Sequence, residues 1–232
     1  MTGRIIVINP NSTEAVTEAM DRALDPLRMA GAPEIESVTN TNGPPGIECQ
    51  AHADDVSRDI RRIIAERDAE ASAFVIACFS DPGIYAAREA TSRPVFGIAE
   101  SGMLTAMSLG ARVGVDAILS RSVPRHMRYF RGIGVEGRVA GDRGIELGVV
   151  ELSDEGKTFE RMVQVGATLR DTDGANVLVL GCAGMARYRE RLSDRLGIPV
   201  VDPTQAAVSM AIGAVQLRQT NGLAVAPAMA AE

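Results

Sequence analysis

The 232-residue sequence is poor in several residue types on which enzymes commonly rely. It has one lysine, two histidines, three cysteines and no tryptophan. A pyridoxal-phosphate enzyme needs a lysine for its Schiff base, and Lys157 lies in a pattern typical of an exposed helix start. With two distant histidines and no C-x-x-C or H-E-x-x-H motif, the sequence argues against a metal site. We therefore expect neither a metal nor another cofactor.

Charge and hydropathy exclude further classes of protein. The 24 basic and 30 acidic residues give a net charge of −6, and the arginines are scattered, which is not the pattern of a nucleic-acid binder. No apolar run approaches the roughly 20 residues of a membrane span. The sequence runs from Met1 directly into a strand-like segment at Arg4, so we expect a cytoplasmic protein with free thiols. The expected partner is a small molecule.

Short apolar runs rich in β-branched residues alternate with helical segments along the whole chain. The expected strands are 4–8, 35–39, 73–77, 94–98, 112–115, 176–181 and 198–201. The expected helices are 14–29, 50–68, one after Pro82, one after the loop 119–122, then 153–170, 183–196 and 203–218. This alternation predicts an α/β fold with mainly parallel sheets covered by helices on both faces.

The two halves of the sequence repeat one scheme. Cys78 and Cys182 each end an apolar strand, and a proline opens the next strand 16 residues after Cys78 and 17 residues after Cys182. Asn11 and Ser120 stand in corresponding turns, 67 and 62 residues before the two cysteines. We infer an internal duplication with two pseudo-symmetric lobes, 1–98 with 205–232 and 99–204. Ligands of such sheets bind beyond the carboxyl ends of the strands, here in the cleft between the lobes.

The cysteine pair is the strongest candidate for chemistry. A lone cysteine is more often a small buried hydrophobe. Here two thiols stand at equivalent places, each before a helix start, where the helix N-terminus should lower the thiol pKa. Thiols facing one cleft from opposite sides could remove a proton from one face of a carbon and return one to the other. Cys49 has no such context, and we interpret it as structural or at most near the pocket.

Three turns and two further motifs also have possible functional interpretations. The turn Asn9–Thr13 could cap a helix or offer polar groups to a ligand, and the two roles are compatible. The turns at 79–81 and 120–121 allow the same two interpretations. The G-x-G-x-x-G segment 132–137 follows a helix instead of a strand, so it does not predict dinucleotide binding. The mixed charges of 187–195 fit a solvated helix face.

Four motifs together resemble a known family. They are Arg4-Ile-Ile-Val-Ile-Asn-Pro-Asn-Ser-Thr13, Ala77-Cys78-Phe79 with Asp81-Pro82-Gly83, Leu119-Ser-Arg-Ser-Val-Pro124 and Leu180-Gly-Cys-Ala-Gly-Met185. The chain resembles the hydantoin racemases of the aspartate/glutamate/hydantoin racemase superfamily, whose near neighbours are the allantoin racemases. The resemblance implies a cofactor-independent racemase with two α/β lobes and with Cys78 and Cys182 as acid/base thiols. It also implies a homo-oligomer.

The residues after the cysteines bear on the substrate. Phe79-Ser80 and Ala183-Gly184 are more apolar than the residues of the amino-acid racemases, which favours a neutral five-membered ring over a zwitterion. In the implied mechanism one thiolate removes the C5 proton, backbone N–H groups and polar side chains stabilise the enolate, and the other thiol reprotonates it. The residues expected to contact the substrate are Asn11, Phe79, Ser80, Asp81, Ser120, Arg121, Gly181, Ala183 and Gly184.

Three alternatives remain open at this point. The first is an aspartate/glutamate-type amino-acid racemase. The second is a decarboxylase or cis–trans isomerase of the same superfamily, although decarboxylation needs only one proton donor. The third is a non-catalytic two-lobed sensor of small molecules, which would need no thiols.

Overall fold

Two parallel four-stranded sheets form the framework of the protein in a computed structural model, which describes residues 3–224. The first sheet contains β1 (Arg4–Asn9), β2 (Glu34–Thr39), β3 (Ala73–Ile76) and β4 (Val95–Gly97) in the order β2-β1-β3-β4. The second contains β5 (Val113–Ala117), β6 (Val139–Gly144), β7 (Val177–Leu180) and β8 (Val200–Val201) in the order β6-β5-β7-β8. The predicted α/β fold is confirmed, and the matching strand orders agree with an internal duplication.

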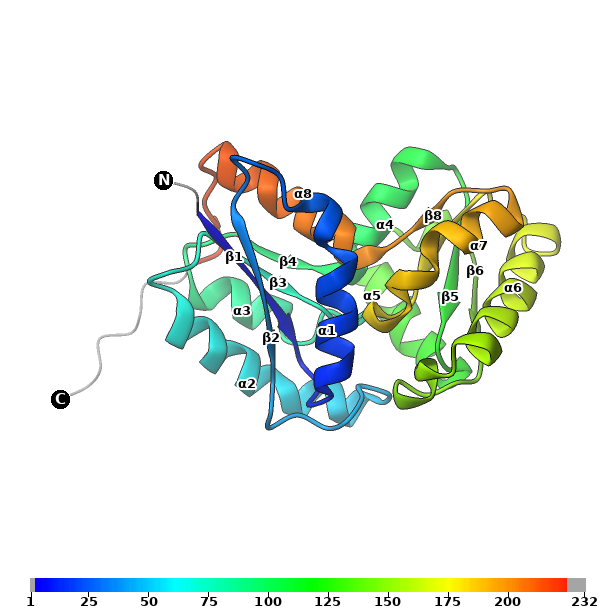
Figure 1. Cartoon of the computed structure of the whole chain (residues 1–232), viewed down its shortest axis with the longest axis horizontal. Helices are drawn as coiled ribbons and strands as arrows, with labels where there is room; N and C mark the ends of the chain where they lie inside the picture. The colour runs from blue at the N-terminus through cyan, green and yellow to red at the C-terminus, as the bar shows by residue number, and fades with distance from the viewer. Residues whose placement is uncertain (1–2, 225–232) are drawn as a thin grey trace.

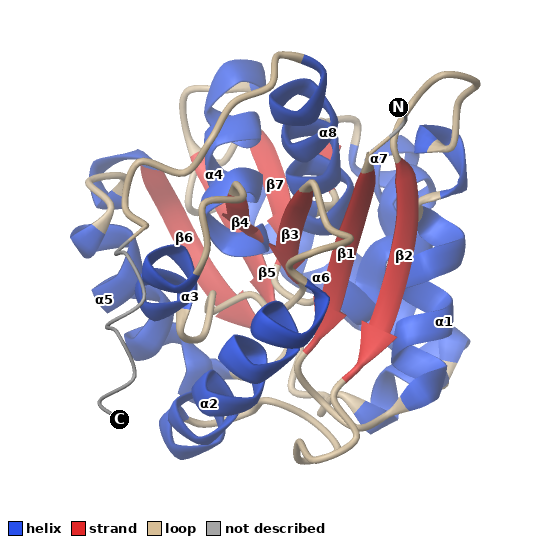
Figure 2. Cartoon of the chain, turned by 90° about the vertical axis from the view of Figure 1, so that its left-hand side faces the viewer, coloured by secondary structure: helices blue, strands red, loops and turns tan. Residues whose placement is uncertain are grey.

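Helices flank both sheets (Figure 2). They are α1 (Glu14–Ala23), α2 (Gln50–Arg67), α3 (Ile84–Ala90), α4 (Ile98–Leu109), α5 (Val123–Gly132), α6 (Glu155–Asp171), α7 (Arg189–Leu196) and α8 (Pro203–Gln216). Short 3-10 turns lie at Asp25–Leu27, Ser120–Ser122, Glu136–Arg138, Val150–Ser153 and Ala183–Tyr188. Within the described residues, no helix has both the length and the apolar character that a membrane span requires.

The continuous apolar runs of the strands are explained by burial on both faces. In β1, Ile5 and Val7 pack in a cluster with α8, whereas Ile6 and Ile8 pack in a separate cluster with α2. All four side chains have no exposed surface. Successive side chains of a strand point to opposite faces, so a strand covered on both sides has no polar alternation.

The helices α4 and α8 are exchanged between the two sheets. α4 follows β4 but packs mainly on β7 and β8, while α8 follows β8 but packs on β3 and β4 (Figure 1). The two helices also pack against each other, and Gly102 allows their close approach. A Cβ atom at Gly102 would lie 2.8 Å from the Cβ of Pro203. This exchange ties the two sheets into one structure. The predicted division into lobes 1–98 with 205–232 and 99–204 stays a prediction. Residues 1–2 and 225–232 lie outside the described part of the chain.

Several elements differ from the predicted ones. The helix expected over 14–29 ends at Ala23, because Pro26 cannot continue the helical hydrogen-bond pattern and a 3-10 turn follows. The first six residues of the helix expected over 183–196 form a 3-10 turn. The helix α4 and the strand β6 were not predicted. β6 has no apolar run, since it carries Gly141, Asp142 and Arg143, and it forms through pairing with β5 at the sheet edge.

Candidate active site

A cavity lies at the carboxyl ends of the central strands of both sheets and contains two cysteines. Cys78 follows β3 and Cys182 follows β7, which hold corresponding positions in their sheets. The space open to a water-sized molecule is about 30 Å³, so the cavity is narrow and its walls lie close together. The lining residues are Asn11, Val16, Ile47, Ala77, Cys78, Phe79, Ser80, Ile118, Ser122, Arg125, His126, Val149, Gly181, Cys182 and Ala183.

A backbone hydrogen bond of the same kind positions both cysteines. Ala77 donates its N–H to the carbonyl of Ile8 at 2.8 Å, and Gly181 donates to the carbonyl of Asp116 at 2.8 Å. Each bond extends the parallel ladder by one residue, so each cysteine is the first residue beyond its sheet. A Cβ at Gly181 would lie 2.7 Å from the Cα of Ala117, so only glycine allows this approach of the strands.

The turn after β1 is held by its own asparagines. Thr13 N–H donates to Asn11 Oδ1 at 2.9 Å, and Asn9 Nδ2 donates to the same oxygen at 3.1 Å. The first of these bonds closes a turn just before α1, whose N-cap residue Thr13 makes no side-chain capping bond. The expected capping role is therefore wrong, and the contact of this turn with a ligand stays a prediction.

Both thiols have raised pKa values. Burial raises the pKa of Cys78 to about 12, with repulsion from Cys182 adding to it and the charge of Arg125 and a hydrogen bond from Ser80 opposing it. Burial raises the pKa of Cys182 to about 11, opposed by a hydrogen bond from the Gly184 N–H. The expected lowering by helix starts is wrong, because α3 begins only at Ile84 and Cys182 is followed by a 3-10 turn.

A buried arginine was not found by sequence reasoning. Arg125 on α5 is only 8% exposed and lines the cavity. Its Nε donates to Ser80 Oγ at 2.9 Å and its Nη2 donates to Ser122 Oγ at 3.3 Å. Within residues 3–224 no carboxylate lies within salt-bridge distance of this guanidinium, and burial lowers its pKa. One arginine among 23 carries no local signal, because its role depends on which face of α5 turns inward.

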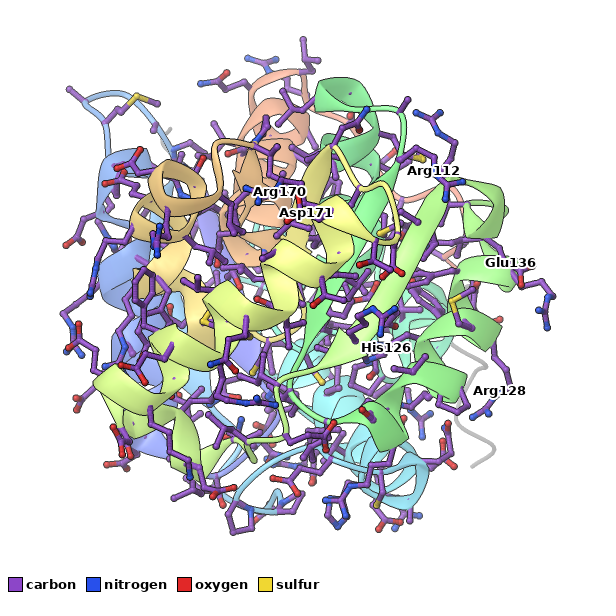
Figure 3. All side chains as sticks on the ribbon, turned by 90° about the vertical axis from the view of Figure 1, so that its right-hand side faces the viewer. Arg112, His126, Arg128, Glu136, Arg170 and Asp171 are labelled. Atoms are coloured by element: carbon purple, nitrogen blue, oxygen red, sulfur yellow. The ribbon has the colours of Figure 1, made fainter. Side chains whose placement is uncertain are left out.

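A histidine–carboxylate pair lies beside the arginine. His126 Nδ1 is 2.9 Å from Asp142 Oδ2, and both side chains are at most 2% exposed. The His126 ring also packs edge-on against Phe79 at 5.3 Å. Figure 3 shows His126 inside the molecule, whereas Arg128 on the same helix extends outward. Asp142 lies on the unpredicted strand β6, so this pair too was absent from the sequence prediction.

Asp81 does not line the cavity, and its structural role is plain. Its carboxylate accepts hydrogen bonds from the N–H groups of Ala99 at 2.8 Å and Glu100 at 2.9 Å, and from the Tyr129 hydroxyl at 2.7 Å. It thus caps the N-terminus of α4, a helix that the sequence analysis had missed. Burial raises the pKa of Asp81 to about 7, against the effect of these hydrogen bonds.

Three other predicted contacts also lie outside the cavity lining. Ser120 donates its N–H to Glu146 Oε1 at 3.1 Å, and its hydroxyl binds the same carboxylate. Arg121 donates to Glu48 Oε2 at 2.6 Å. The 3-10 turn points both residues outward, and Ser122 lines the cavity instead. Gly184 acts through its N–H, which faces the sulfur of Cys182.

The structure thus brings together one group of the expected site residues. These are Asn11, Cys78, Phe79, Ser80, Gly181, Cys182 and Ala183. Their contacts with a substrate stay predictions. Within the described residues no group of histidine, cysteine and acidic side chains is arranged to hold a metal ion.

Known proteins resemble this chain in sequence and fold over most of its length. The sequence model of the Asp/Glu/Hydantoin racemase family matches residues 5–211. The chain belongs to this family. Hydantoin racemase from Paenarthrobacter aurescens is 38% identical to this family member over 220 residues, 92% of each chain. The structure of allantoin racemase from Klebsiella pneumoniae has a TM-score of 0.92 and 32% identity, covering 99% of this chain and 96% of that one. Allantoin racemase from Pseudomonas fluorescens has a TM-score of 0.93 and 28% identity, covering 99% and 100%.

In this member of the racemase family, the two motifs set aside in the sequence analysis lie away from the cavity. The glycine-rich segment 132–137 joins the end of α5 to a 3-10 turn and leads into β6. On the charged segment, Arg191 pairs with Glu155 at 2.8 Å, and both side chains are more than half exposed. Neither segment contributes to the cavity lining.

Proposed function

We propose that this protein is a cofactor-independent racemase that interconverts the enantiomers of 5-substituted hydantoins or of allantoin. The observation that carries the proposal is the placement of Cys78 and Cys182 at corresponding strand ends in one small cavity. The identity to a hydantoin racemase and the high TM-scores to two allantoin racemases support the substrate class.

In the proposed reaction the two thiols act as base and acid on opposite faces of the ring. The thiolate of one cysteine takes the proton from C5, and the electron pair of the C–H bond moves onto the adjacent carbonyl oxygen as an enolate. The thiol of the other cysteine then gives its proton to the opposite face of C5 and becomes the thiolate. Backbone N–H groups beside the cysteines and the amide nitrogen of Asn11 are suited to hold the ring oxygens.

The polarity of the cavity supports a neutral ring over an amino acid. Its lining carries one arginine and no carboxylate, so an ammonium group would meet no counter-charge. Burying an unpaired ammonium is costly, which disfavours an aspartate- or glutamate-type substrate. The apolar side chains of Val16, Ile47, Ile118 and Val149 suit the body of a five-membered ring with a C5 substituent.

Polarimetry on purified protein tests this proposal. We expect the optical rotation of an enantiopure 5-substituted hydantoin or of allantoin to decay to zero, and that of aspartate to stay constant. Cys78→Ser and Cys182→Ser should each reduce racemisation by about 10²–10⁴-fold, because a hydroxyl is a far weaker acid and base at this position. Cys49→Ser is the matched control and should keep most of the activity, since Cys49 does not line the cavity.

Three results would contradict the proposal. Full activity of either cavity variant would show that proton transfer does not need both thiols. Release of carbon dioxide from a malonate-type acid without any racemisation would favour a decarboxylase, and tight ligand binding without turnover would favour a sensor.

A further inference from the structure

The two halves of the cavity supply different groups to their cysteines. The residue two positions after Cys182 is Gly184, whose backbone N–H donates to the sulfur. The residue two positions after Cys78 is Ser80, which offers a hydroxyl at the corresponding place. The helices that follow β1 and β5 differ as well. α1 presents the apolar side chain of Val16 to the cavity, and α5 presents Arg125.

The hydrogen bonds around Ser80 have a defined direction. Arg125 Nε is a donor only, and it donates to Ser80 Oγ at 2.9 Å. The single hydroxyl proton of Ser80 is therefore left to point elsewhere. Ser80 lies in the same tight turn as Cys78, because its N–H donates to the Cys78 carbonyl at 2.8 Å. All three side chains line the cavity, and the Arg125–Ser80 bond links the guanidinium to the turn that carries Cys78.

Among the described residues, no carboxylate lies within salt-bridge distance of the Arg125 guanidinium, and Asp142 acts on its charge from a greater distance. A guanidinium that is 8% exposed costs free energy to bury unless an anion offsets its charge. The nearby Asp142 is held by His126 at 2.9 Å. The charged and titratable groups that act on this part of the cavity are Cys49, Cys78, Asp81, Arg125, Arg128, Asp142 and Cys182. Around Cys182 they are Glu48 and Asp202, both acidic.

We propose that Arg125, acting through Ser80, is a positioning residue that selectively stabilises the thiolate of Cys78 and has no counterpart at Cys182. The inference rests on the proposed two-thiol racemase. It states that the protein stabilises the thiolates of the two cysteines to different extents. One face of the ring meets a thiolate held by a cation and a hydroxyl. The other face meets a thiolate held by a backbone N–H beside two acidic residues. The site is thus pseudo-symmetric in fold and asymmetric in electrostatics.

The test measures each thiol alone, without substrate. Cys49→Ala with Cys182→Ala leaves Cys78 as the sole cysteine, and Cys49→Ala with Cys78→Ala leaves Cys182. The rate of alkylation by iodoacetamide is followed by mass spectrometry from pH 7 upward, because only the thiolate reacts. Arg125→Gln should slow the alkylation of Cys78 at least tenfold at fixed pH, because the thiolate loses the neighbouring positive charge. The apparent pKa of Cys182 should change by less than about half a unit.

Further variants separate charge from structure. Arg125→Lys keeps the positive charge and should restore at least half of the alkylation rate. Ser80→Ala should raise the apparent pKa of Cys78 alone, since it removes the hydroxyl. Arg128→Gln is the matched control on the same helix. It removes the same charge from an exposed side chain that binds Gln50, and it should leave both thiols unchanged.

The outcomes that overturn the proposal are distinct from a failure of the proposed function. No slowing at Cys78 in Arg125→Gln, or equal slowing at both thiols, would refute it. If Arg125→Gln does not fold by circular dichroism, an unchanged pKa of Cys78 in Ser80→Ala refutes it instead. Because alkylation needs no hydantoin, a protein that racemises nothing can still show the selective slowing, and an active racemase can lack it.

Discussion

At the scale of single residues, burial dominates the chemistry of this protein. Asp116 on β5 has no exposed surface, and neither carboxyl oxygen has a hydrogen-bond partner among the described residues. Burial raises its pKa well above the usual range, and repulsion from Asp142 adds to the effect. The same desolvation holds both cavity thiols in their neutral form. These groups make stability and activity depend on pH in opposite directions.

The first prediction concerns Asp116 and stability. Because its folded pKa is raised, the unfolded chain loses this proton near pH 4 while the folded protein keeps it. Stability should therefore fall as pH rises above about 4. Each pH unit should reduce the equilibrium constant for folding by up to about tenfold. Asp116→Asn should be more stable than the wild type in urea denaturation at pH 8 and similar at pH 4. Asp171→Asn, on an exposed side chain paired with Arg170, serves as control, and an equal gain there would contradict the account.

The second prediction concerns the thiols and activity. With pKa values of about 12 for Cys78 and about 11 for Cys182, the thiolate is scarce near neutral pH. We expect kcat/KM for racemisation to rise by nearly tenfold per pH unit from about pH 7 to about pH 9, without a plateau at the ordinary thiol pKa of about 8.5. A pH profile of initial rates by polarimetry measures this. A plateau below pH 8 would contradict this prediction. It would mean that the thiols are not buried during catalysis as they are in the protein without substrate.

At the scale of elements, α4 depends on a distant residue for its N-terminal cap. Its N-cap position is Gly97, which has no side chain to accept a hydrogen bond, and the carboxylate of Asp81 takes that place. A Cβ atom at Gly97 would lie 2.1 Å from the carboxyl carbon of Asp81, so the glycine makes room for the cap. Asp81 itself has a φ of 42°, a conformation that this compact turn imposes.

The third prediction follows from this cap. Asp81→Ala should lower the free energy of unfolding by about 1–2 kcal/mol through the lost cap, and further through the unpaired Tyr129 hydroxyl. Since Asp81 does not line the cavity, KM in the polarimetric assay should change less than threefold. Asp154→Ala removes the exposed cap of α6 and should cost at most about 1 kcal/mol. A large rise in KM with unchanged stability would restore Asp81 as a substrate contact.

At the scale of the whole molecule, two loops from different sheets meet over the cavity. Ile47 follows β2, Val149 follows β6, and both line the cavity. Glu48 links the two loops. Its carboxylate accepts a hydrogen bond from the Val149 N–H at 3.1 Å and forms an ion pair with Arg121 at 2.6 Å. Gly46 permits the contact, since a Cβ there would lie 2.8 Å from the Val149 side chain.

The fourth prediction concerns this bridge. Glu48→Gln weakens the link between the loops, so we expect iodoacetamide to reach Cys78 several times faster at constant pH. Cys78 is the readout, because the charge of Glu48 also raises the pKa of Cys182. Racemisation should fall by about tenfold, because a looser cover admits water to the reacting groups. The melting temperature should move little, as for Glu190→Gln, which breaks an exposed ion pair elsewhere. Unchanged alkylation rates in Glu48→Gln would show that the loops open independently of this residue.

The homo-oligomer and the cytoplasmic location stay predictions, the first of which light scattering can test.

The amino-acid sequence by itself determined the α/β class, most of the strands and the family. It also placed Cys78 and Cys182 at corresponding strand ends, because buried parallel strands leave long apolar runs and a duplicated scheme repeats its spacing. Only the tertiary structure decided the surroundings of the thiols. Arg125 turns inward, Ser120 turns outward, and Asp142 enters on an edge strand without an apolar run. Each depends on packing between segments distant in sequence, and local periodicity carries no record of that packing.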